Sequence, residues 1–163
     1  MNKYIAFIGY YGPIILFIVI ILGFFSIKIT DPRAYILLLL WQVLNTYLNL
    51  GLKHIIKQPR PKNQINTTYS DSLNTNEYGM PSGHAQQVVS EMIFILLFFK
   101  NIWIKLFSII QTLLTIYHRY INKKHSCYQL IVGCIIGFFV GIIFYNITNV
   151  YKYFHKGSTL PYS

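Results

Sequence analysis

The longest uncharged run of the chain is SCYQLIVGCIIGFFVGIIFYNITNVY, residues 126–151. It exceeds the roughly 20 apolar residues that a helix needs to cross the hydrocarbon core of a bilayer. Within it, Gly133, Gly137 and Gly141 recur every four residues and therefore lie on one face of a helix. A stripe of small residues lets another helix approach closely, so we expect a membrane span that packs tightly against a neighbour.

Four further apolar segments precede this run. Residues 4–27 are uncharged, long enough to span and without a small-residue cleavage site, which favours a retained helix over a cleaved signal peptide. Residues 34–52 form a second clear span, whereas residues 84–99 and 102–117 are shorter and less clear. The pattern predicts an all-α integral membrane protein, a single domain over residues 1–163 with a bundle of about five (four to six) transmembrane helices.

The composition agrees with a membrane protein, because 54% of the residues are hydrophobic and 11% are charged. The net charge of +10 could serve a nucleic acid, acidic lipid head groups or a bound phosphate. No basic run is interleaved with aromatic residues on a soluble domain, which argues against nucleic acid. Cys127 and Cys134 are seven residues apart on one helix, so their Cα atoms are about 10 Å apart, too distant for a disulfide.

A polar segment at residues 53–82 interrupts the apolar runs. It shows no sustained apolar period, and it contains the turn-forming residues Pro59, Pro61, Gly79 and Pro81. Such a segment predicts a loop. In a bundle with five crossings this loop lies on the same side of the membrane as residues 117–125, because two helices separate them.

These segments carry three cations, Lys53, Arg60 and Arg119, and two histidines, His84 and His125. Phosphoryl transfer needs cations around the phosphate oxygens, an in-line nucleophile and an acid for the leaving group. One imidazole can attack phosphorus to form a phosphohistidine while the other protonates the departing oxygen. A single histidine at a helix end is usually a capping or interfacial residue, but two of them beside three cations favour a phosphate site.

Two small residues precede His84, at the expected start of a helix. The backbone N–H groups of Ser82 and Gly83 can therefore bind an anion at the helix N-terminus. The three remaining histidines have no carboxylate or cysteine companions at metal-ligand spacing. We expect no metal and no other cofactor.

Three blocks resemble the three-part signature of the type 2 phosphatidic acid phosphatase superfamily: Lys-x6-Arg-Pro at residues 53–61, Pro-Ser-Gly-His at residues 81–84 and Arg-x5-His at residues 119–125. The resemblance implies a membrane helix bundle that hydrolyses phosphate without metal, with His125 as nucleophile and His84 as general acid. It also implies a set of phosphate-binding residues, namely Lys53, Arg60, Ser82, Gly83 and Arg119.

The chain departs from the superfamily pattern at two positions, where it has His118 in place of Ser and Gln129 in place of Asp. Gln129 lies one helical turn beyond His125 and could accept a hydrogen bond from its ring, but it cannot neutralise an imidazolium. This Gln and the stretch YGMPSGHAQ at residues 78–86 are similar to the dolichyl diphosphatase branch. A diphosphate substrate is compatible with the Gln, since phosphate leaves more readily than an alkoxide.

Two further polar residues have no assigned role. His118 either donates to phosphate or is an interfacial residue, and the second interpretation is slightly favoured. Glu91 is the only acid within an expected span and shares the helical face of His84. An intramembrane acid is a functional candidate, and Glu91 could orient His84 or pair with a lysine.

We therefore expect hydrolysis of a membrane lipid diphosphate, such as dolichyl diphosphate, to the monophosphate and inorganic phosphate. A broader lipid phosphatase acting on phosphatidic acid or isoprenoid phosphates, and a catalytically silent membrane scaffold, are the alternatives. The positive charges are balanced between the two sides, so the positive-inside rule gives no orientation. The resemblance implies a lumenal site in the endoplasmic reticulum, that of the host for a viral protein, and the glycosylation sequon Asn66-Thr67-Thr68 lies in the site loop.

Overall fold

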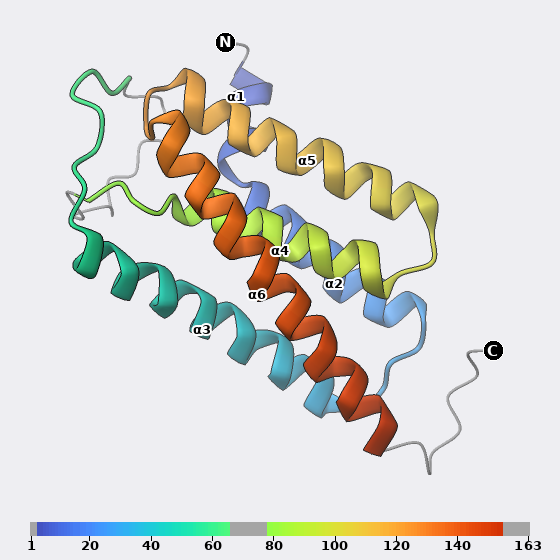
Figure 1. Ribbon diagram of the computed structural model, residues 1–163. Helices are drawn as coiled ribbons and strands as arrows, with labels where there is room; N and C mark the ends of the chain where they lie inside the picture. Colours follow the sequence, from blue (N-terminus) through green and yellow to red (C-terminus); the bar gives the residue numbers. More distant parts are fainter. Residues whose placement is uncertain (1–2, 66–77, 155–163) are drawn as a thin grey trace.

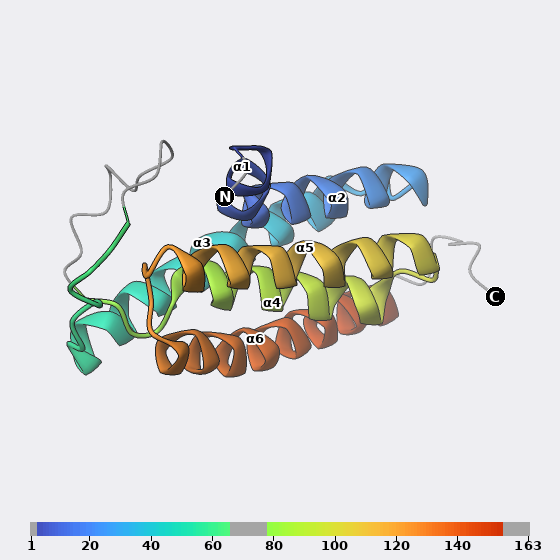
Figure 2. The same cartoon turned by 90° about the horizontal axis from the view of Figure 1, so that it is seen from above.

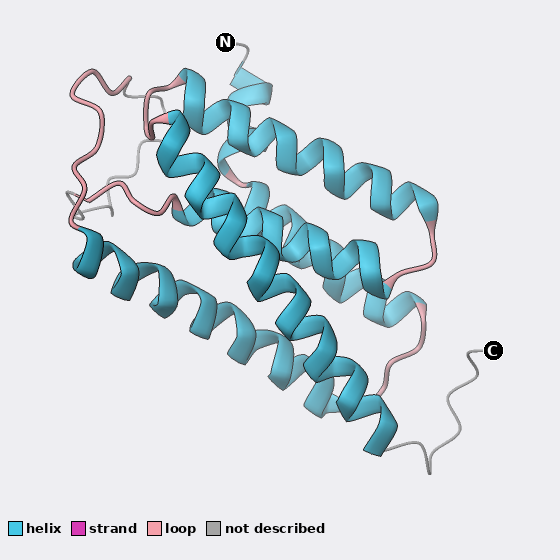
Figure 3. Ribbon diagram, in the orientation of Figure 1, coloured by secondary structure: helices cyan, strands magenta, loops and turns pink. Residues whose placement is uncertain are grey.

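The computed structural model describes residues 3–65 and 78–154. They form six helices: α1 (Lys3–Tyr10), α2 (Gly12–Ser26), α3 (Pro32–Ile56), α4 (Gly83–Phe98), α5 (Ile102–Ile121) and α6 (Cys127–Phe154) (Figure 1). Apart from an isolated antiparallel bridge between Pro59 and Tyr78, the described residues contain only helices and loops (Figure 3). The all-α fold predicted from the sequence is confirmed.

The first uncharged run is two helices and not the single helix that we predicted. α1 ends at Tyr10, α2 begins at Gly12, and α1 points away from the axis of α2 (Figure 2). Pro13 occupies the first turn of α2. Its ring cannot donate a backbone hydrogen bond and clashes with the carbonyl of residue i−4, so a helix that arrives from Gly9 has to end here.

α3 and α5 extend further than their apolar residues predict. α3 continues to Ile56, so Lys53 lies in its last turn and the polar loop begins at Lys57, not at Lys53. Lys57 ends the helix in the left-handed conformation, with φ of 51°, and basic side chains in the last turn interact favourably with the helix dipole. α5 continues to Ile121, which places Arg119 on a helix.

α4 is the centre of the bundle and contacts α2, α3, α5 and α6. α6 lies along α4, with its three glycines against the backbone carbonyls of α4 and its cap, in the pairs Gly133 with Ser82, Gly137 with Gln86 and Gly141 with Ser90. A side chain at any of these glycines would collide with those oxygens. The small-residue stripe predicted from the sequence is therefore a helix-packing surface. Cys127 and Cys134 are both free, as their spacing predicts.

The outer surface of the bundle is apolar and part of its interior is polar. On α3, Leu40 and Leu44 are 51% and 67% exposed, whereas Asn45 and Asn49 are 2% and 6% exposed. Large exposed apolar faces of this kind indicate an apolar environment. Two segments, Pro32–Ile56 and Cys127–Asn149, are long and apolar enough to cross a membrane by length and composition.

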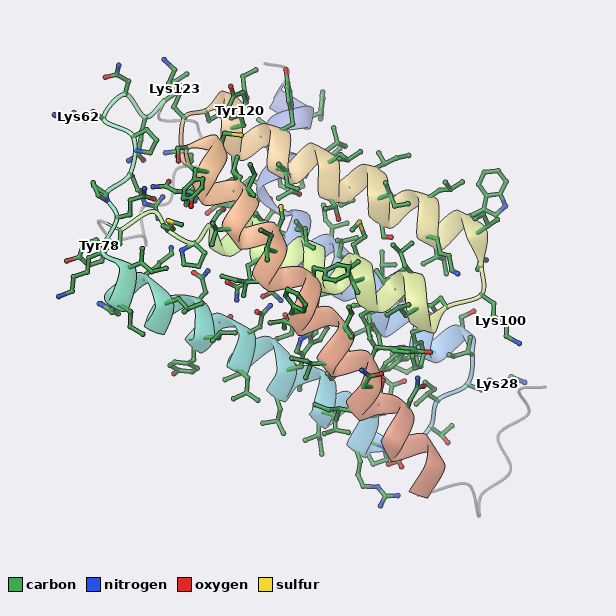
Figure 4. The ribbon with its side chains drawn as sticks, in the orientation of Figure 1. Lys28, Lys62, Tyr78, Lys100, Tyr120 and Lys123 are labelled. Carbon is green, nitrogen blue, oxygen red and sulfur yellow. The ribbon has the colours of Figure 1, made fainter. Side chains whose placement is uncertain are left out.

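The loops that carry the sequence blocks meet at one end of the bundle, which we call the site end. The Ile65 N–H donates to the Asn122 carbonyl at 3.0 Å, and the Ser82 N–H donates to the Gln129 carbonyl at 3.1 Å. Lys62 and Lys123 lie at this end, while Lys28 and Lys100 lie at the opposite end (Figure 4). The sequon at residues 66–68 lies outside the described residues.

Candidate active site

A cavity of about 500 Å³ at the site end collects most of the predicted site residues. Its lining includes six of the eight: Lys53, Arg60, Gly83, His84, Arg119 and His125. They come from the end of α3, the following loop, the start of α4, the end of α5 and the turn before α6. The three sequence blocks, which are far apart in the chain, therefore contribute to one cavity.

The three cations differ in their exposure. Lys53 and Arg119 are 5% and 1% exposed, and Arg60 is half-buried. Positive side chains enclosed in this way attract a multiply charged anion more strongly than they would in water, because little solvent screens them. Arg can bind two oxygens of one phosphate at once, whereas Lys acts as a point charge.

The N-terminus of α4 faces the cavity through Gly83 and His84. Ser82 is the N-cap, and its Oγ accepts a hydrogen bond from the Ala85 N–H at 3.4 Å. The partial positive charge of a helix N-terminus favours an anion at this place. Ser82 itself is fully buried and does not line the cavity. Its hydroxyl caps α4, and its N–H, which the sequence predicted to bind an anion, donates to the Gln129 carbonyl at 3.1 Å instead.

His125 is oriented by the backbone of the polar loop. Its Nδ1 lies 2.9 Å from the carbonyl oxygen of Gly79. A carbonyl oxygen can only accept, so this bond requires the proton on Nδ1 and leaves the lone pair on Nε2. His125 thus presents an unprotonated nitrogen, which is the form that can act as a nucleophile.

The surroundings of His125 also favour its neutral form. Burial is the main cause that holds its pKa well below the ordinary value of 6.5. Nearby positive charge lowers the pKa further, contributed in decreasing order by Arg119, Arg60, Lys53 and His84. A neutral imidazole among cations is suited to attack a phosphorus atom that those cations hold.

Gln129 does not make the hydrogen bond to His125 that the sequence predicted. Its Oε1 accepts from the Ser126 N–H at 3.2 Å, and its Nε2 donates to the Pro59 carbonyl at 2.9 Å and to Gln58 Oε1 at 3.1 Å. The backbone carbonyl of Gly79 takes the place next to the ring. Gln129 therefore holds the loop after α3 against the start of α6.

His118 is not an interfacial residue, because its side chain is only 1% exposed. It lies under the N-terminal helix, where a Cβ on Gly9 would come within 2.5 Å of the His118 Cβ. The cavity lining does not include it. The slightly favoured interpretation from the sequence is wrong, and the residue belongs to the packing of α1 on α5.

Glu91 lines the same cavity, deeper in the bundle than His84. Its Oε1 accepts hydrogen bonds from Gln42 Nε2 at 2.8 Å and Gln87 Nε2 at 3.1 Å. Its Oε2 has no hydrogen-bond partner among the described residues. Within residues 3–65 and 78–154, Glu91 makes neither the contact with His84 nor the pair with a lysine that we considered, and it instead joins α3 to α4.

Tyr10, which the sequence analysis did not single out, is a neighbour of two predicted site residues, although it does not line the cavity itself. Its ring centroid lies 5.6 Å from that of His84, and the Arg119 Cζ lies 6.0 Å from the same centroid. The only signal in the sequence was the interruption of the first run by Gly12 and Pro13, which could have ended a helix next to this residue. That signal does not show where the shortened helix points.

The described residues contain no group of three or more His, Cys, Asp or Glu side chains that could hold a metal ion. What the cavity offers is a cluster of cations, a helix N-terminus and two imidazoles. This set of groups suits a phosphate and the transfer of its phosphoryl group.

A bundle of apolar helices with these groups at one end is the architecture that the three sequence blocks led us to expect. The family model of the PAP2 superfamily matches residues 34–152, and the chain belongs to that superfamily. An undecaprenyl-diphosphatase of Sulfolobus acidocaldarius is 31% identical to it over 91 residues, which are 56% of this chain and 44% of that protein. The chain thus spans less than half the length of this relative, and no solved structure matches the chain.

Proposed function

We propose that the protein is a membrane phosphatase that hydrolyses a lipid diphosphate to the lipid monophosphate and inorganic phosphate without a metal ion. The observation that carries this proposal is the single cavity in which three cations and two histidines lie together. An enclosed group of cations binds a phosphate, and the two imidazoles supply a nucleophile and an acid.

The apolar part of the cavity supports a lipid as the substrate. Ile14 and Phe17 of α2 and Leu39 and Val43 of α3 line the same cavity as the cations. A hydrocarbon tail can lie between these helices while its charged head group reaches the site end. Soluble phosphate esters would leave this apolar lining exposed to water, which is unfavourable.

Two observations favour a polyprenyl diphosphate over other lipids. The relative from Sulfolobus acidocaldarius is named an undecaprenyl-diphosphatase, and the stretch at residues 78–86 together with Gln129 is similar to dolichyl diphosphatases. A diphosphate also releases a phosphate, which needs less help to depart than an alkoxide. Dolichyl diphosphate is accordingly our first choice of substrate.

In the first step His125 Nε2 attacks the terminal phosphorus in line with the bridging oxygen. The bond from this phosphorus to the bridging oxygen breaks, and His84 gives a proton to the departing lipid monophosphate. Lys53, Arg60 and Arg119 hold the oxygens of the transferred group, whose charge they offset in the transition state. The Gly79 carbonyl keeps the proton on Nδ1 of His125, so that Nε2 remains the attacking nitrogen.

In the second step water attacks the phosphohistidine. His84, now neutral, takes a proton from the water, the nitrogen–phosphorus bond breaks, and inorganic phosphate leaves. Both imidazoles then return to their starting protonation states. The net reaction consumes one water for each diphosphate, and no oxidant, reductant or metal enters it.

We further propose that α2, α3, α4, α5 and α6 each cross the bilayer and that α1 lies at the site end. This arrangement gives five crossings and leaves all three sequence blocks on one side, which the resemblance suggests is the lumen of the endoplasmic reticulum. The exposed apolar faces of the helices and the lysines at both ends of the bundle support it (Figure 4).

Phosphate release from the purified protein in detergent with EDTA tests the proposed reaction. We expect release from dolichyl or undecaprenyl diphosphate, much less from phosphatidic acid, and none from His125→Ala. Phosphatidic acid as the better substrate would indicate the broader lipid phosphatase. No release from any lipid, with the His125→Ala protein behaving like the parent, would indicate a scaffold, and release that stops on chelation would refute the metal-free mechanism.

A further inference from the structure

We propose that the N-terminal helix α1 is part of the active site, where it carries Tyr10 as a positioning residue for His84 and Arg119. This inference rests on the proposed function, because it assigns a role toward the general acid and a phosphate-binding residue. α1 lies outside the segment that matches the PAP2 superfamily, which begins at residue 34. The family match therefore does not include Tyr10.

The ring of Tyr10 contacts two functional side chains at once. It lies 5.6 Å from the His84 ring with an interplanar angle of 47°, and the Arg119 Cζ is 6.0 Å from its centroid. The His118 ring lies 6.4 Å away at 76°. The half-buried Tyr10 ring thus bridges α4 and α5 at the place where each helix presents a site residue.

An aromatic ring is the right group for this place. Arg119 is a cation, and His84 has to be a cation when it acts as the acid, so the two side chains repel each other. The negatively charged face of an aromatic ring attracts cations within about 6 Å. Tyr10 can therefore hold both side chains near one phosphate. A carboxylate at this place would also attract them, but its negative charge would neutralise the cations that the substrate needs.

α1 is docked on α5 by contacts that fix the position of Tyr10. The Gln111 Nε2 of α5 donates to the Ile8 carbonyl at 2.8 Å, which satisfies an acceptor near the end of α1. The Gly9 backbone rests on the His118 side chain, which leaves no room for a Cβ. Both contacts are made by residues directly before Tyr10, in the last turn of α1.

They also give His118 a role. Where the superfamily usually has Ser before the third-block Arg, this chain has a larger ring that supports the N-terminal helix. His118 and Tyr10 then act together. Through His118, α5 fixes the position of α1, and through Tyr10, α1 contacts Arg119 at the end of α5.

The first test compares three variants for phosphate release from the lipid diphosphate. We expect Tyr10→Leu to lower kcat about tenfold, because two ring-to-cation contacts are lost. Tyr10→Phe keeps the ring and should retain most of the activity. Tyr4→Leu, the same change at an exposed site of α1, is the matched control and should equal the parent. Equal activity of Tyr10→Leu and the parent would overturn the inference.

The second test asks whether α1 acts through Tyr10. Gly9→Val places a branched side chain against His118 and should displace α1, lowering kcat about as much as Tyr10→Leu does. The double variant Gly9→Val/Tyr10→Leu should then be no slower than either single variant. If the two losses multiply, α1 and Tyr10 act independently and the docking part of the inference is wrong.

The third test does not depend on activity. In protein with 13C-labelled histidine, the His84 ring signal, assigned with His84→Gln, should shift in Tyr10→Leu and stay nearly unchanged in Tyr10→Phe, because both aromatic rings produce a ring current. An unchanged His84 signal in Tyr10→Leu would refute the inference even if the parent is active. A shifted signal in a protein that releases no phosphate would instead refute the proposed function and leave the contact established.

Discussion

The His125 imidazole receives its orientation from the carbonyl oxygen of Gly79, 2.9 Å from Nδ1. The family pattern has a carboxylate near this position, and the sequence led us to expect Gln129 to substitute for it. A carbonyl fixes the tautomer as well as a carboxylate does, but it carries no charge to stabilise an imidazolium. His125 therefore depends on burial and on neighbouring cations to remain a neutral nucleophile.

We predict that the His125 signal of 13C-histidine-labelled protein, assigned with His125→Gln, reports a neutral ring at pH 6.5. Its pKa lies below 6.5 in the folded protein because burial and the nearby cations disfavour the charged form. The unfolded chain therefore binds the proton more readily, and the stability that His125 contributes is lost as the pH falls from about 6.5 through the folded pKa. A midpoint at or above 6.5 would contradict this prediction.

Gln129 connects α6 to the loop after α3 and does not hydrogen-bond to the nucleophile. Its amide nitrogen donates to the Pro59 carbonyl and to Gln58, so Gln129→Glu replaces a donor by a charged acceptor that faces a carbonyl oxygen. We expect this variant to lose about 1–3 kcal/mol of stability, measured as the free energy of unfolding in detergent. Gln64→Glu, the same change at an exposed position of the loop after α3, should be nearly neutral. Equal stability of the two variants would show that the hydrogen bonds from Gln129 to Pro59 and Gln58 do not stabilise the fold.

At the scale of the helices, the sequence predicted four of the apolar segments as single helices, and each is one helix in the structure. Their length and apolar composition, and the glycine stripe of the last one, carried enough information for this. The split of the first run was not predicted, because its hydrophobicity is continuous across Gly12 and Pro13. The late ends of α3 and α5 were missed since their last turns hold Lys53 and Arg119, whose polarity resembles that of a loop.

The site could be predicted as a set of residues but not as a geometry. The spacing within the blocks identified Lys53, Arg60 and Arg119, and the cavity brings them together. The contacts of Gln129 and Tyr10 could not be predicted, because both depend on how separate elements approach one another. No spacing rule within one helix reports the position of the loop at Pro59 or the direction of α1.

Gly137 and Gly51 both lie within helices, but only Gly137 is needed for close packing against another helix. A Cβ at Gly137 of α6 would collide with the Gln86 carbonyl of α4, whereas a Cβ at Gly51 of α3 has no neighbour within 4 Å. We expect Gly51→Ala to stabilise the protein by about 0.5–1 kcal/mol, as alanine does in an open helix position, and Gly137→Ala to destabilise it. Thermal unfolding in detergent compares them. Stabilisation by Gly137→Ala as well would indicate that α4 and α6 are not in close contact.

For the whole molecule, the decisive property is the side of the membrane on which the site end lies. Lys62 and Lys100 are exposed residues at opposite ends of the bundle (Figure 4). In a Cys127→Ser/Cys134→Ser background, we expect Lys62→Cys to react with a membrane-impermeant maleimide only after sealed microsomes are opened, and Lys100→Cys to react before. The lipid diphosphate head group must reach the cations from the side of Lys62, so phosphate release should also become detectable outside the vesicles only on opening. Labelling of both positions from the same side would contradict an odd number of crossings between them, and with it the five-span arrangement that places all three sequence blocks around one cavity.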